Sequence, residues 1–159
     1  MRKIKNEKGF TLIEILVVIG IIAILAAIVL VAINPARQFA QANNTQRTSN
    51  VNAILNAVGQ YMVDNNGSIP TAITTSNQSV SDAGADICGD LVPTYMPALP
   101  VDPTATTTTA TDDGQVSSSE CSGTYDTGYK ILKDSDGRIT VSAPNTDLSV
   151  ASTTISVTR

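Results

Sequence analysis

The sequence contains no histidine and no tryptophan, and only two of its 159 residues are cysteines. The absence of histidine excludes a His-based catalytic triad, and two cysteines alone are too few for a tetrahedral zinc site. No glycine-rich phosphate-binding loop with its lysine is present either. We therefore expect a protein that is not an enzyme.

Positive charge is scarce after residue 9. The first nine residues carry four basic side chains and one acidic one, whereas the rest carries six basic and thirteen acidic residues, a net charge of −7. An acidic domain repels phosphate backbones, so general nucleic-acid binding is not expected.

A long apolar run follows the basic start. From Phe10 to Ile33 the only polar side chains are Thr11 and Glu14. These residues would span roughly 36 Å as a helix, which is enough to cross a hydrocarbon core of about 30 Å. Helical structure is expected because lipid offers no partners for backbone polar groups. The basic residues before the run place the N-terminus in the cytoplasm and the C-terminal domain outside the membrane.

Glu14 is the least expected residue of this run. A carboxylate at the bilayer centre costs about 2.5–3.5 kcal/mol on insertion scales, so a charged residue there indicates a functional site. A secretory signal peptide and a simple uncleaved anchor are two alternatives, but neither explains Glu14. The run holds no lysine, arginine or histidine. A free α-amine would be a suitable partner if the chain were cut just before the run.

The segment Lys8-Gly9-Phe10-Thr11-Leu12-Ile13-Glu14-Ile15 closely resembles the processing motif of the type IV prepilin family. The resemblance implies that a membrane-bound prepilin peptidase cuts between Gly9 and Phe10 and that Phe10 is then N-methylated. It further implies a homo-oligomeric helical filament, with Glu14 facing the amine of a neighbour. The implied partners are minor pilins, an inner-membrane platform protein and an assembly ATPase.

The same resemblance implies an α+β type IV pilin fold, with a long kinked N-terminal helix packed on a small antiparallel sheet. Processing would move the subunit from the bacterial cytoplasmic membrane into an extracellular or periplasmic filament. The expected parts are a leader (1–9), a membrane and filament-core helix (10–33), an amphipathic helix half (34–66) and a head (67–159) with an αβ-loop (about 67–127) and a sheet (about 128–158).

Two residues are expected to bend the long helix. Pro35 lacks the amide of a helical residue, and Gly20 is a weak point within the membrane segment. The alternative for Pro35 is a plain helix boundary at the membrane surface. Apolar residues at three- and four-residue spacing then predict that helical structure resumes after residue 36 and stops at Asn65-Asn66-Gly67. We predict one helix of about 55 residues.

The predicted strands lie late in the chain. Residues 128–133 and 138–143 flank a four-residue hairpin connection, and residues 149–158 supply a third strand. Residues 71–85 are predicted to form a polar loop. The proline-rich residues 91–103 predict an ordered, non-helical path over the sheet.

Cys88 and Cys121 both fall on the side predicted to be outside, where disulfides persist. A disulfide between them is expected, with two free thiols as the alternative. Oxygen ligands for calcium are the other candidate feature of the head, namely Asp102, Asp112 and Asp113, with Glu120 and Asp126. The alternative is that these acidic residues are simply solvated.

The sequence is compatible with three functions. A surface pilin is favoured by the cysteine pair and the threonine- and serine-rich surface. A type II secretion or competence pseudopilin is the alternative, and the Leu99-Pro100-Val101-Asp102-Pro103 segment resembles pseudopilin domains. The remote alternative is a binding protein anchored by one uncleaved helix.

Overall fold

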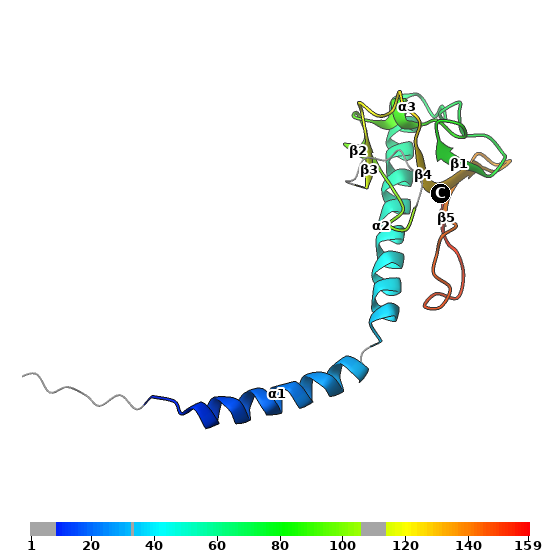
Figure 1. Cartoon of the computed structure of the whole chain (residues 1–159). Helices are drawn as coiled ribbons and strands as arrows, with labels where there is room; N and C mark the ends of the chain where they lie inside the picture. The colour runs from blue at the N-terminus through cyan, green and yellow to red at the C-terminus, as the bar shows by residue number, and fades with distance from the viewer. Residues whose placement is uncertain (1–8, 33, 106–113) are drawn as a thin grey trace, which may run out of the picture. The chain divides into compact units, whose positions relative to one another are not determined.

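The computed structural model describes residues 9–32, 34–105 and 114–159. The chain divides into two units, Met1–Ala36 and Arg37–Arg159. The first unit holds the apolar helix, and the second holds a helix and the strands around it (Figure 1).

Helix α1 (Leu12–Ala32) is apolar around its whole circumference. Its large side chains are more than half exposed within the chain, as expected of a helix made to be surrounded by lipid or by other apolar helices. Over the described residues, one helix is long and apolar enough to cross a membrane, from Leu12 to Leu30. The helix continues through Gly20 without interruption.

The predicted 55-residue helix is divided into two helices. α1 ends at Ala32, and α2 (Pro35–Asp64) begins at the proline. Proline is favoured at the first position of a helix, because its ring presets φ and the amide that it lacks has no partner there. Pro35 therefore opens the second helix rather than lying within a single long one.

Helix α2 buries one face at three- and four-residue spacing: Ala40, Asn44, Arg47, Val51, Ile54, Leu55, Ala57 and Val58. It ends directly before Asn65. Asn66 and Gly67 both adopt positive φ, 55° and 83°, and the Gly67 amide donates to the Met62 carbonyl at 2.7 Å. This is the six-to-one bond of a Schellman-type helix end.

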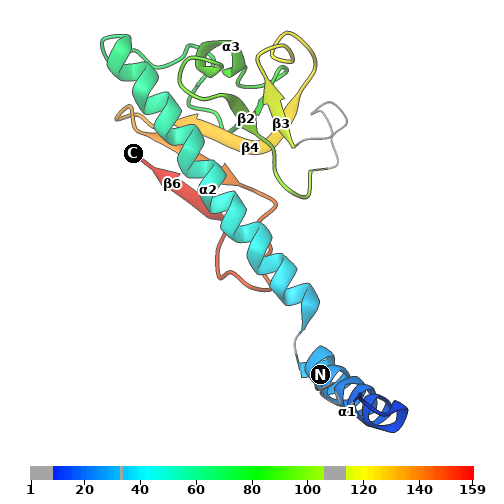
Figure 2. The same cartoon turned by 90° about the vertical axis from the view of Figure 1, so that its left-hand side faces the viewer.

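Four antiparallel strands form the main sheet, in the order β1 (Gln78–Ser81), β4 (Asp126–Lys133), β5 (Ile139–Ala143) and β6 (Ile155–Thr158). Alternate residues of β4 and β5 are buried against α2, which runs alongside the sheet (Figure 2). The predicted α+β class with a small antiparallel sheet is confirmed.

Several short elements were not predicted. β1 lies within the predicted polar loop 71–85, and the proline-rich segment contributes β2 (Ala98–Pro100). β2 pairs with β3 (Gln115–Ser117) in a separate two-stranded sheet, and helix α3 (Cys88–Leu91) precedes both. The predicted third strand is shorter than expected, since β6 starts only at Ile155.

Candidate functional site

The predicted cleavage site lies outside the helix. Gly9 and Phe10 are not helical, both are exposed, and α1 begins two residues later at Leu12. The first backbone hydrogen bond of this region runs from the Ile15 amide to the Thr11 carbonyl at 3.4 Å. Among residues 9–32, a cut between Gly9 and Phe10 would therefore break no helical hydrogen bond.

Thr11 and Glu14 form a reciprocal cap at the start of α1. The Thr11 amide and hydroxyl donate to Glu14 Oε2 at 2.7 and 2.8 Å, and the Glu14 amide donates to Thr11 Oγ1 at 3.3 Å. This is a capping box, in which an N-cap threonine and the glutamate three residues later satisfy each other's backbone amides.

The cap amends the expectation about Glu14. A free amine was expected to be its one suitable partner, but Thr11 already gives the carboxylate two hydrogen bonds within the same chain. Thr11 offers no compensating charge, and the three bonds leave Oε1 unused. The sequence signal that would have identified this role was Thr-x-x-Glu directly before an apolar run.

Asp102 is a buried partner of Arg47. Arg47 Nε lies 2.7 Å from Asp102 Oδ2, and the two side chains are 2% and 0% exposed. Arg47 Nη2 also donates to Asp102 Oδ1 at 3.1 Å and to the Thr104 hydroxyl at 2.7 Å. Burial raises the pKa of Asp102, but the hydrogen bonds from Arg47 and Thr104 outweigh it, and the net pKa is lowered.

The calcium candidates are not brought together among the described residues. Both oxygens of Asp102 are bound by Arg47, and Glu120 Oε2 accepts from the amide and hydroxyl of Ser117 at 2.6 Å. Asp112 and Asp113 lie outside the described residues. No group of three potential metal ligands occurs in the described part of the chain. Calcium binding remains an untested prediction.

A polar network fastens α2 to the head. The Asn44 side chain donates to the Asp147 carbonyl at 2.9 Å and accepts from the Asp147 amide at 3.0 Å. Asn44 also accepts from Arg47 Nη1 at 2.9 Å. One helix face is thereby bonded both to the segment after β2 and to the loop after β5, which fixes the rotation of α2 about its axis.

Cys88 and Cys121 form a disulfide in the structure, with their Cα atoms 5.3 Å apart. Cys88 opens α3 and is fully buried, while Cys121 lies in the turn after β3. The bond ties the two-stranded sheet to α3. Both described cysteines are used, so the described residues include no free thiol.

An apolar groove of about 910 Å³ lies along the last turns of α2. Its walls include Leu55, Gly59, Met62 and Val63 from the helix and Tyr95 from the loop after α3. Sequence patterning did not indicate this groove, because its far wall comes from segments remote along the chain.

Comparison with known proteins supports the interpretation of the N-terminal segment. Residues 4–30 match the family described as the prokaryotic N-terminal methylation motif. A segment of 75 residues is 44% identical to the type IV wide pilus major component PilA4 of Thermus thermophilus, covering 47% of this chain and 51% of that protein. The match thus spans about half the length of the curated relative. No solved structure matches the chain.

Proposed function

We propose, on the premise of the type IV pilin family membership that these similarities support, that the chain is a structural subunit of a pilus filament. One observation carries the proposal: a methylation motif leads directly into a helix that is apolar on every side and has one capped carboxylate in its first turn. The large side chains of this helix are more than half exposed among the described residues, and a bundle of identical helices would cover them.

Processing is proposed to occur between Gly9 and Phe10, followed by N-methylation of Phe10. The exposed, non-helical geometry of this bond supports the proposal, because a peptidase must bind its substrate in an extended form. The cut would create the α-amine of Phe10 at the N-terminal end of α1. The Glu14 carboxylate, held by Thr11, lies at the same end.

Glu14 is proposed to pair with the Phe10 amine of a neighbouring subunit. Breaking a buried ion pair by removing one partner leaves the other charge unpaired, so such a pair is better at fixing axial register than at adding affinity. The Thr11 bonds support this role, since they direct the carboxylate toward the N-terminal end of the helix and leave Oε1 available.

Before assembly, the chain is proposed to cross the cytoplasmic membrane once, with its N-terminus in the cytoplasm. The prepilin peptidase, the platform protein and the assembly ATPase are the proposed partners at that stage. Among the filament alternatives, a surface pilin is preferred to a secretion pseudopilin, because the relative described above is named as a major component of a wide pilus.

The N-terminus of the mature protein tests the proposal. Sheared surface filaments and membranes would be analysed by mass spectrometry after proteolysis, and the first peptide of the filament fraction is expected to begin with N-methylated Phe10. A mature chain that begins at Met1, or downstream of Glu14, would refute it. In the variant Glu14→Gln we expect normal membrane insertion with loss of filaments, and normal filaments would remove Glu14 from the mechanism.

A further inference from the structure

The exposed surface of α2 carries no charge over most of its length. Between Gln38 and Val63 the only charged residue is Arg47, which is 2% exposed and paired with Asp102. Identical copies of an acidic head repel one another wherever like charges meet. An uncharged helix face is therefore a surface on which a second copy of this chain can approach without that penalty.

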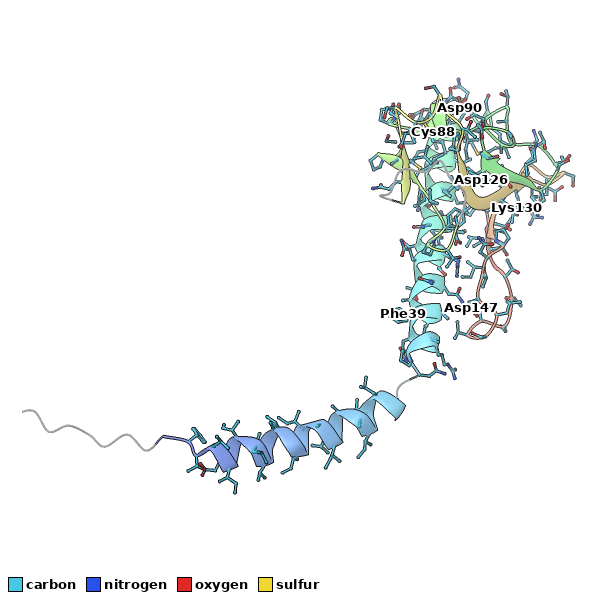
Figure 3. The ribbon with its side chains drawn as sticks, in the orientation of Figure 1. Phe39, Cys88, Asp90, Asp126, Lys130 and Asp147 are labelled. Carbon is cyan, nitrogen blue, oxygen red and sulfur yellow. A yellow bond between two sulfur atoms is a disulfide. The ribbon has the colours of Figure 1, made fainter. Side chains whose placement is uncertain are left out.

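Phe39 projects from the first turns of α2. Its side chain is 71% exposed, and it is the only phenylalanine of the unit Arg37–Arg159. Figure 3 shows it at the same end of the head as Asp147. An aromatic ring offers a large apolar area with little rotamer entropy to lose, so an exposed one is a suitable anchor for an interface.

The apolar groove lies near the opposite end of the same helix. Gly59 has no side chain there, and a Cβ added to it would meet no atom within 4 Å. Val63 stands at the groove and is 81% exposed. Two residues of opposite charge, Asp64 and Arg159, also line the groove, and the Arg159 guanidinium is a suitable neighbour for the face of an aromatic ring.

The Phe39 ring and the groove beside Gly59 are placed so that the same contact can repeat from one copy of the chain to the next. Phe39 and Gly59 are twenty residues apart, which corresponds to about 30 Å along the helix and about 200° around its axis. The two features therefore face nearly opposite directions at different heights. A parallel copy shifted along the axis would bring its ring against the groove of the next, and such a head-to-tail contact builds an open filament.

We propose that Phe39 of one copy inserts into the groove beside Gly59 and Val63 of the next copy. The inference rests on the filament proposed above and names one of its contacts between heads. The bound ring would be covered by Leu55, Met62 and Tyr95, and the touching copies would be displaced by about 30 Å along α2.

Cysteine cross-linking in filaments made by the full-length chain tests the contact. Cys88 and Cys121 are already joined, so introduced thiols would react mainly with one another. The double variant Ala42→Cys/Gln60→Cys keeps Phe39, Gly59 and Val63, because Ala42 lies one turn after the ring on the same helix face and Gln60 lines the groove. Treated with a short bismaleimide, it is expected to give a ladder of dimers, trimers and longer multimers. Each single variant should remain monomeric. A double variant without multimers, or symmetric dimers from Ala42→Cys alone, would overturn the contact.

Filament yield provides a second readout. Phe39→Ala and the groove-filling Gly59→Leu are each expected to lower the sheared filament yield by roughly tenfold, with unchanged membrane levels and melting temperature. Leu148→Ala is the matched control, since Leu148 is also an exposed apolar residue, at 62%, and should leave the yield unchanged. Equal losses in all three variants, or none, would overturn the proposal. If the wild type forms filaments but the variants refute the Phe39 contact, the proposed function as a filament subunit still stands. If the wild type never forms filaments, the contact and the proposed function both fail.

Discussion

Replacing Asp102 with asparagine tests how strongly α2 is fastened to the head. The variant removes the carboxylate charge that contacts Arg47, whose side chain is only 2% exposed. Breaking a buried ion pair in this way costs about 3–5 kcal/mol. For a head of this size, we expect the melting temperature to fall by on the order of 10–20 °C.

The assay is thermal unfolding of the full-length chain in detergent, followed by circular dichroism. Asp134→Asn is the matched control, because Asp134 pairs with Arg138 in an ion pair whose arginine is 61% exposed, and solvent screens such a pair. It should change the melting temperature little. The double variant Asp102→Leu/Arg47→Met should recover much of the lost stability, since apolar replacement removes both buried charges together. If Asp102→Asn melted within about 2 °C of the wild type, the argument for a buried pair would be refuted.

The Asp102 carboxylate, the Thr11 cap and the disulfide each give a further test. Acidification below about pH 4 should lower the melting temperature of the wild type more than that of Asp102→Asn. The pKa of Asp102 is lower in the folded state, so the stability that the ionised carboxylate contributes is lost as pH falls through that pKa. Parallel curves of melting temperature against pH for the two proteins would contradict this. Thr11→Ala should speed hydrogen exchange at the Glu14 amide in micelles, whereas Thr11→Ser should not, because only the serine retains a hydroxyl cap. Reducing Cys88–Cys121 should destabilise the head by up to about 3.8 kcal/mol on the chain-entropy model, measured as the shift in melting temperature with reductant; no shift would contradict a structural bond.

The apolar helix was predictable because its signal is local, whereas Pro35 was expected to bend one long helix and instead begins α2. Composition alone identifies a stretch made for lipid, and Pro35 marks a place where helical bonding is interrupted. The cap of Glu14 by Thr11 was also predictable, since its residues are three positions apart, but a lone carboxylate in an apolar run equally predicts pairing with another chain.

The contacts that position the head could not be predicted in the same way. Arg47 and Asp102 are 55 residues apart, and nothing near either residue indicates the other. Asp102 was instead grouped with neighbouring acidic residues as a calcium candidate. β1 was missed because it is a four-residue edge strand of glutamine, serine and valine, and its pairing with β4 depends on the folded sheet.

The cap at the start of α1 has a consequence for maturation. Thr11 and Glu14 both lie on the C-terminal side of the proposed cut, so their three hydrogen bonds belong equally to the precursor and to the trimmed chain. The first turn of α1 would therefore not have to refold when the leader is removed. Cleavage would then add a positive α-amine at Phe10 without changing the fold of the first helical turn. The precursor would therefore already have the helix start of the mature subunit.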